Sequence, residues 1–160
     1  MTSEAHLWPQ HAVPLYTRML EAWNRRDADA FAALFTESCN VVGFDGSQMN
    51  GRDQTASELR AIFASHPTAA YVAKVRDVRQ LDGRVALLRA VVGMIPPGQH
   101  DLNPAVNAIQ SVVVVLNSGE PRVALLHNTP ASFHGRPQLT GQLTAELREV
   151  LRSGRIVDPG

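Results

Sequence analysis

The chain has 160 residues in which 15 Lys and Arg balance 15 Asp and Glu, and Cys39 is its only cysteine. This length can bury a core without staples, and a lone cysteine excludes an internal disulfide and fits a reducing cytoplasm. The balanced charge argues against a nucleic-acid partner, and no run approaches the roughly 18 apolar residues of a membrane span. We expect one cytoplasmic domain over residues 1–160, with residues 1–10 as a flexible N-terminus.

Two short helices are predicted near the N-terminus. Apolar residues recur at steps of three and four across residues 11–26, which places them on one helical face with Pro14 in the first turn. Asp27 is a favourable N-cap for a second helix, whose apolar stripe runs from Ala30 to Phe35. The tight connection between the two patterns indicates a helical hairpin.

A short strand and a third helix follow. Residues 39–44 are rich in β-formers and end at the turn signal Asp45-Gly46-Ser47. Residues 53–65 carry inward-facing apolar positions at helical spacing, and His66-Pro67 closes that segment. We expect a brief strand, a bend and then a helix.

The hydrophobic period changes after residue 70. Asp82-Gly83 is the strongest hairpin signal in the chain, because both residues tolerate the positive φ angles of a tight turn. A final amphipathic helix is predicted over residues 137–153. The fold class is therefore α+β, with a curved antiparallel sheet against a three-helix N-terminal layer and a C-terminal helix. Its four long strands are predicted at residues 71–81, 84–96, 106–117 and 122–134.

The run Val112 to Leu116 is apolar on both faces of its strand. Both faces of such a strand must be shielded from water by other parts of the protein or by a partner. One face can meet the helices, while the other meets either a second copy of the chain or the chain's own C-terminal helix. We expect a homodimer formed through the sheet, with coverage by the C-terminal helix as the alternative.

The order of these elements resembles the cone-shaped nuclear transport factor 2-like superfamily, which includes ketosteroid isomerases and SnoaL-like polyketide cyclases. Particular stretches are similar to the SgcJ/EcaC branch of that superfamily. These stretches are Glu21-Ala22-Trp23-Asn24-Arg25-Arg26-Asp27-Ala28 with Phe31-Ala32-Ala33-Leu34-Phe35, Val42-Gly43-Phe44-Asp45-Gly46 with Gly51-Arg52, Asp101-Leu102-Asn103-Pro104-Ala105, and His127-Asn128-Thr129-Pro130-Ala131.

That resemblance implies an apolar pocket between sheet and helices and a link to secondary metabolism, including enediyne polyketides. Members of the branch are often labelled oxidoreductases. The sequence has no Gly-x-Gly-x-x-Gly turn between a strand and a helix, so we expect no nucleotide cofactor. Its six histidines show no zinc-helix spacing, so we also expect no metal.

Asp45 and His127 are the candidate catalytic residues. An Asp in an apolar pocket can remove a proton beside a carbonyl, as in the ketosteroid isomerases. Alignment with that family places Gly43 near the base position and Asp45 two residues further on. The alternative for Asp45 is a turn aspartate beside Gly46 that accepts backbone N–H bonds. His127 could act as acid, base or donor, or be held by a backbone carbonyl or by Asn107.

Other polar residues on apolar strands are candidates for substrate binding. Side chains alternate along a strand, so only one of His127 and Asn128 can face the pocket, and Gln110 and Asn107 also lie on opposite faces. Arg89 could bind a ligand carboxylate or form an edge ion pair. Five residues could line the pocket or belong to the core, namely Tyr16, Trp23, Met49, Phe63 and Met94.

The irregular loop from Pro96 to Pro104 could be a lid, a dimer contact or a plain connection. Two functional hypotheses follow. In the first, the protein binds a hydrophobic, partly oxygenated polyketide-type intermediate and catalyses proton transfer or cyclisation. In the second, it is a non-catalytic binding or accessory protein, such as a carrier or assembly partner, and Gly43 at the base position favours this alternative.

Overall fold

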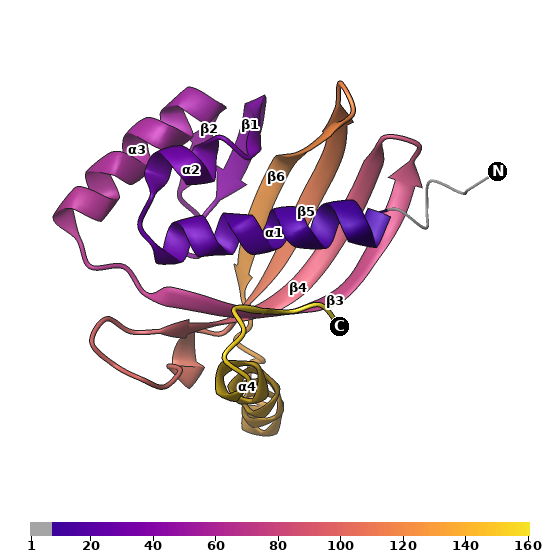
Figure 1. Ribbon diagram of the computed structural model, residues 1–160. Coiled ribbons are helices and arrows are strands. Elements are labelled where there is room, and N and C mark those ends of the chain that lie inside the picture. Colours follow the sequence, from indigo (N-terminus) through magenta and orange to yellow (C-terminus); the bar gives the residue numbers. More distant parts are fainter. Residues whose placement is uncertain (1–7) are drawn as a thin grey trace.

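The computed structural model describes residues 8–160, and it places three helices on one side of a curved sheet and a fourth on the other (Figure 1). The N-terminal layer contains α1 (Trp8–Asn24), α2 (Ala28–Ala32) and α3 (Arg52–Ser65). The predicted flexible segment lies outside the described residues except for positions 8–10, which belong to α1. Trp8 is fully buried in the core, so the helix starts three residues earlier than its periodicity suggested.

The early start of α1 also moves Pro14 from the predicted first turn into the helix interior. Proline lacks an N–H, so the carbonyl of Gln10 loses its usual helical partner. Gln10 is solvent-exposed, so water can satisfy that carbonyl. Asp27 caps α2 as predicted, since its carboxylate accepts a 3.0 Å hydrogen bond from Ala30 N. Phe35 does not continue that helix but begins the first strand.

The sheet has seven strands in the order β2-β1-β6-β5-β4-β3-β7. Its neighbours are antiparallel except for β1 with β6 and β3 with β7, so the sheet is mixed where the sequence indicated a purely antiparallel one. Parallel pairing joins segments far apart in the chain, and local patterns carry no signal for it. The strands are β1 (Phe35–Val42), β2 (Gln48–Asn50), β3 (Ala70–Asp82), β4 (Val85–Ile95), β5 (Ala108–Asn117), β6 (Glu120–Pro130) and β7 (Val157–Asp158).

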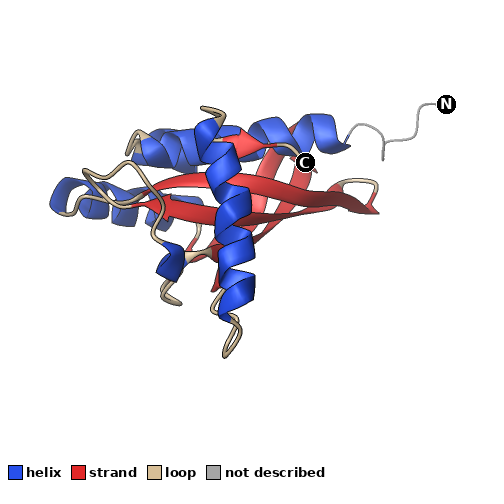
Figure 2. Ribbon diagram, turned by 90° about the horizontal axis from the view of Figure 1, so that it is seen from below, coloured by secondary structure: helices blue, strands red, loops and turns tan. Residues whose placement is uncertain are grey.

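The inner face of the sheet, covered by α1 to α3, carries the main core. The opposite, outer face is crossed at one end by α4 (Pro137–Arg152), as Figure 2 shows. Leu143, Leu147 and Val150 of α4 pack there against Val72 and Val91 in a second cluster. The C-terminal helix therefore covers one part of the outer face, and none of residues 112–116, for which a second covering was predicted, belongs to this cluster. Among residues 8–160, no helix combines the length and apolar character needed to cross a bilayer.

The loop from Pro96 to Pro104 docks beneath α4 rather than over the inner face. Leu102 is buried against that helix, and both carboxylate oxygens of Asp101 accept hydrogen bonds from Arg148 at 3.1 and 3.0 Å. Asn103 N also donates to Met94 O at 2.9 Å. The loop leads into a short 3-10 turn, η2 (Pro104–Val106). This placement argues against a lid, one of the three roles that the sequence left open for the loop.

Two glycines near α4 should respond oppositely to substitution. A Cβ at Gly93 would lie 3.0 Å from a Leu102 methyl and 3.2 Å from a Leu147 methyl. Gly93→Val is therefore expected to lower the free energy of unfolding by about 1–3 kcal/mol through overpacking. Gly141 is exposed within α4 with open space around it, so Gly141→Ala should add roughly 0.5–1 kcal/mol. Urea unfolding of both variants measures this contrast, and equal effects would contradict the packing described.

Candidate functional site

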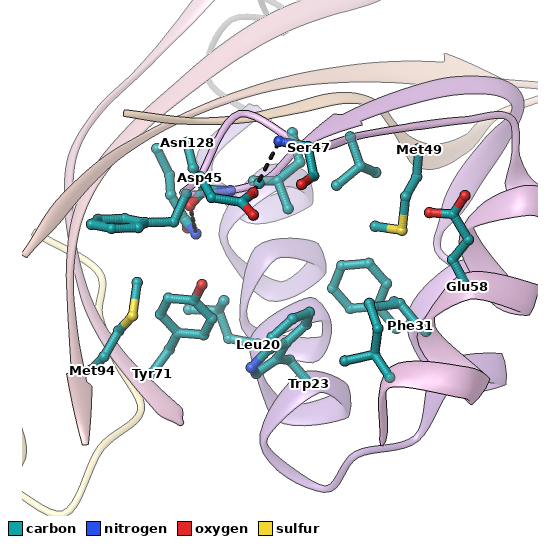
Figure 3. Close-up of a pocket in the computed structure, with 17 residues that line it drawn as sticks. Leu20, Trp23, Phe31, Asp45, Ser47, Met49, Glu58, Tyr71, Met94 and Asn128 are labelled. Carbon is teal, nitrogen blue, oxygen red and sulfur yellow. Dashed lines mark hydrogen bonds between the residues drawn. The ribbon is translucent and has the colours of Figure 1, made fainter. Parts of the chain in front are cut away.

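A cavity of about 310 Å³ lies between the helical layer and the sheet (Figure 3). Its walls are mostly apolar. The volume of the cavity is at the small end of the range for small-molecule sites, which favours a compact guest. The wall combines residues from α1, α2, α3, β1 and the turn that follows it, β2, β3, β4, β5 and β6. They are Leu20, Trp23, Phe31, Val41, Gly43, Phe44, Asp45, Ser47, Met49, Glu58, Leu59, Ile62, Tyr71, Met94, Gln110, Leu126 and Asn128.

One end of the cavity is built on a chain of buried hydrogen bonds. Tyr16 Oη donates to Gln110 Oε1 at 2.5 Å, and Gln110 Nε2 donates to Asn128 Oδ1 at 2.8 Å. Asn128 Nδ2 then donates to Val42 O at 2.9 Å. Burial, followed by the neighbouring Tyr71, raises the pKa of Tyr16 well above its ordinary value, so its phenol stays a donor. Tyr16 does not line the cavity; it fixes the amide of Gln110, which does.

Tyr71 supplies a second phenol, and sequence reasoning did not select it. Its backbone is held by Asn24, whose side chain accepts from Tyr71 N at 2.8 Å and donates to Tyr71 O at 3.0 Å. Its hydroxyl points across the cavity toward the wall that holds Asp45 and Asn128 (Figure 3), and no described residue hydrogen-bonds to it. Burial raises the pKa of Tyr71 to about 12. This hydroxyl is therefore a protonated donor available to a guest.

Trp23 organises the aromatic part of the wall. Its ring makes edge contacts with Phe31, Phe63 and Tyr71 at centroid separations of 5.9, 5.2 and 5.6 Å. Its Nε1 donates to Ala69 O at 3.0 Å, which fixes the indole in place. Phe63 supports this cluster from behind and does not line the cavity, whereas Met49 and Met94 do.

Asp45 lies at the rim of the cavity and is exposed to solvent. Its Oδ1 accepts a 2.9 Å hydrogen bond from Ser47 N within a turn in which Gly46 N also donates to Gly43 O at 3.0 Å. Gly46 has a φ of 89°, which favours glycine there. The hydrogen bonds from Ser47 lower the pKa of the Asp45 carboxyl. Asp45 is thus a turn aspartate and a weak base, the alternative that the sequence had left open.

The structure places His127 outside the cavity, on the exposed outer face of β6. His127 pairs with Ser111 in a regular register, and a β-bulge follows: Val113 pairs with Leu125 but Val114 pairs with Val123, so Ala124 is the extra residue. The bulge turns Val123 inward together with Leu126 and Asn128. His127 and Asp45 therefore do not share a site, and the two-residue catalytic arrangement considered from the sequence is not assembled.

Two other candidates also lie outside the cavity. Arg89 is on the outer face, where its guanidinium hydrogen-bonds to Asp77 and lowers the pKa of that carboxyl. Asn107 is buried on the other side of the sheet and donates from Nδ2 to Thr144 Oγ1 at 2.9 Å. Of Asn107 and Gln110, Gln110 lines the cavity, and of His127 and Asn128, Asn128 does. Within residues 8–160, no cluster of three His, Cys, Asp or Glu side chains is arranged to hold a metal.

The model of the SnoaL-like domain matches residues 16–114, which is more than half of the chain. The protein belongs to the SnoaL-like domain family. The matched segment of this SnoaL-like domain runs from Tyr16 in α1 into β5, and so contains most of the cavity wall. No curated protein matches the chain significantly.

Solved structures share the fold of this SnoaL-like domain. A cystatin-like domain of unknown function from Nostoc punctiforme PCC 73102 is 24% identical with a TM-score of 0.71, covering 88% of each chain. A ketosteroid isomerase-like protein from Erwinia carotovora atroseptica is 16% identical, with a TM-score of 0.61 over 82% of this chain and 99% of that one. An NTF-2 like protein of unknown function from Shewanella oneidensis MR-1 is 18% identical, with a TM-score of 0.60 over 73% and 94%. These likenesses establish the cone-shaped architecture.

Proposed function

We propose that this protein binds a compact, hydrophobic and partly oxygenated small molecule in the cavity. The observation that carries this proposal is the Tyr71 hydroxyl, a donor without a described protein partner that faces the open space of an otherwise apolar chamber of about 310 Å³. Tyr71 is half-buried and lines the cavity, so water or a guest can pair with its hydroxyl there. A guest with a carbonyl or hydroxyl oxygen would pair with it and bury its rings against Trp23 and Phe31.

The guest belongs, in our proposal, to the polyketide-type intermediates of secondary metabolism, and the protein binds it in the cytoplasm. Flat oxygenated rings suit a wall of aromatic and methionine side chains with an amide and phenol end. The similarity of the His127 to Ala131 stretch and the Asp101 to Ala105 stretch to the SgcJ/EcaC branch supports this class, including an enediyne pathway.

Binding without catalysis is the function that the geometry supports best. His127 lies on the wrong face, and the lowered pKa of Asp45 makes it a poor proton acceptor. A carrier or accessory protein needs only the cavity. Proton transfer or cyclisation is the second candidate, because the Asp45 carboxylate does line the cavity.

Calorimetric titration with 1-naphthylmethanol, a neutral two-ring alcohol, tests binding. We expect saturable one-to-one binding that weakens in Tyr71→Phe by roughly threefold to tenfold, the loss of one hydrogen bond.

Proton transfer is tested separately by following exchange of the acidic C–H protons of 2-tetralone in D₂O by NMR. Exchange that the protein accelerates and that Asp45→Asn abolishes would establish catalysis, and absence of saturable binding would contradict the proposed function.

Affinity for the neutral alcohol should not change between about pH 5 and pH 10. Hydrogen bonds from Ser47 lower the pKa of Asp45, so that carboxylate is already ionised at the acidic end of this range. Burial raises the pKa of Tyr71 to about 12, so its hydroxyl remains protonated at the alkaline end. Titrations at closely spaced pH values check this expectation. An inflection within this range would contradict it.

We also propose that the protein forms a homodimer through the part of the outer face that α4 leaves open. Leu87 pairs with Val113, and Val113 pairs with Leu125, so three half-buried apolar side chains form a row across β4, β5 and β6. Ile109, also on that face, is 40% exposed. A second copy of this row would cover it symmetrically.

Light scattering coupled to size-exclusion chromatography tests the dimer. The wild-type protein is expected to elute with the mass of two chains. Val113→Lys should yield a folded monomer, because a charge in the middle of the row would be desolvated in a dimer. Ser57→Lys, an exposed position on α3 on the opposite side of the sheet, should leave the dimer intact. A monomeric wild type would contradict the proposed pairing.

A further inference from the structure

The wall of the cavity has an uneven charge. Seventeen residues line it, and among them Asp45 and Glu58 are acidic while none is Lys, Arg or His. The chain as a whole has as many basic as acidic side chains. The excess of negative charge is therefore local to this cavity, and it disfavours guests that carry a carboxylate or phosphate.

Neither carboxylate is neutralised by a cation of the described chain. Asp45 accepts the Ser47 N–H, and Glu58 Oε1 accepts a 2.8 Å hydrogen bond from Gln54 Nε2, a neutral amide. The two arginines of α3 are engaged elsewhere: Arg52 donates to Phe35 O at 3.3 Å, and Arg60 pairs with Asp29 outside the cavity. Glu58 Oε2 accepts no hydrogen bond from a described residue.

The aromatic side chains of the wall add to the same preference. Trp23, Phe31 and Tyr71 surround the space that Asp45 and Glu58 flank in Figure 3. Electron-rich ring faces attract cations, and tryptophan does so most strongly. A chamber with aromatic rings and carboxylates suits an organic ammonium group attached to an apolar body.

We propose that the natural guest is a hydrophobic amine, whose protonated nitrogen lies at the rim beside the Asp45 carboxylate, with Glu58 adding negative charge from α3 on the other side of the cavity. Its apolar body fills the chamber beside Trp23, and an oxygen on that body accepts from the Tyr71 hydroxyl. This inference rests on the proposed binding function and narrows its ligand class to cationic molecules. Because Asp45 is exposed, the ammonium group keeps part of its hydration, which avoids the cost of burying a bare charge.

Three probes of similar shape and different charge test the inference: 1-naphthylmethylamine, 1-naphthylmethanol and 1-naphthoate. Their dissociation constants are measured at pH 7 and low ionic strength. We expect the amine to bind roughly threefold to tenfold more tightly than the alcohol, and the carboxylate more weakly than both. Raising the salt concentration to about 0.5 M should reduce the advantage of the amine, because exposed carboxylates are screened.

A charge-matched pair of variants locates the effect. Asp45→Asn with Glu58→Gln retains the oxygens that accept from Ser47 and Gln54, and should bring the amine-to-alcohol ratio close to one. Glu37→Gln with Asp53→Asn removes the same charge from exposed positions outside the cavity and should leave the ratio unchanged. Alcohol binding without an amine preference would overturn the inference and leave the proposed function standing. Failure of all three probes to bind would overturn the proposed function itself, and with it the inference.

Discussion

Gln110→Leu is expected to lower the free energy of unfolding by about 2–4 kcal/mol, although leucine is close to glutamine in size. Gln110 is 1% exposed, and its amide accepts from Tyr16 and donates to Asn128. Removing the amide leaves a buried hydroxyl and a buried carbonyl without partners, and each carries a desolvation cost. Urea unfolding followed by circular dichroism measures the loss.

The Tyr16→Phe variant separates the hydrogen-bond chain from simple packing. It removes the hydroxyl that pairs with Gln110 and should cost about 1–2 kcal/mol. The double variant should be less destabilised than the sum of the single variants, because the hydroxyl orphaned by Gln110→Leu is then gone. Additive effects, or a loss below about 0.5 kcal/mol for Gln110→Leu, would show that the chain of hydrogen bonds does not stabilise the fold.

Met49→Trp should weaken binding of 1-naphthylmethanol by more than about tenfold, because the larger indole occupies the space that the guest needs. Met49 lies on the short edge strand β2, where its half-buried side chain lines the cavity. An edge position can absorb the added bulk with a smaller loss of stability than a position in a central strand. Calorimetric titration measures the change in affinity.

Gln48→Trp is the matched control for this substitution. Gln48 is the neighbouring residue of β2, and since side chains alternate along a strand it points away from the cavity and is exposed. Its replacement adds the same indole without filling the chamber, so affinity should stay within about twofold of the wild type. Equal losses in the two variants would mean that the probe binds somewhere other than the cavity.

Periodicity was sufficient to predict most elements of the fold. Stripes at helical spacing identified α1 and α3, and alternation with the Asp82-Gly83 turn identified the β3–β4 hairpin. Helix starts and strand partners depend on tertiary contacts, which is why Trp8 and Phe35 were assigned wrongly. The pairing of β1 with β6 joins residues more than eighty positions apart, such as Val42 and His127, and no local pattern encodes it.

The cavity was harder to predict than the fold. Trp23, Met49, Met94, Gln110 and Asn128 were selected as polar or soft residues on apolar faces, and all of them line it. Alternation alone grouped His127 with Val123, and only the bulge at Ala124 shows that these two side chains lie on opposite faces. Nothing in the sequence was a reason to select Tyr71. It lies at the start of β3, where too few residues precede it for an alternating pattern to show which face its side chain takes. Tyr71 lies across the cavity from Asp45 only because the tertiary structure brings β3 and the turn after β1 together.

The methyl groups of the methionines offer the most direct measurement of the central claim, that a guest enters the chamber between sheet and helices. Met49 and Met94 line the cavity, whereas Met19 is fully buried in the core away from its wall. In protein with ¹³C-labelled methionine methyl groups, we predict that 1-naphthylmethanol shifts the Met49 and Met94 signals and gives them NOEs to its ring protons, with Met19 unaffected. Saturable binding that leaves Met49 and Met94 unchanged would contradict the account.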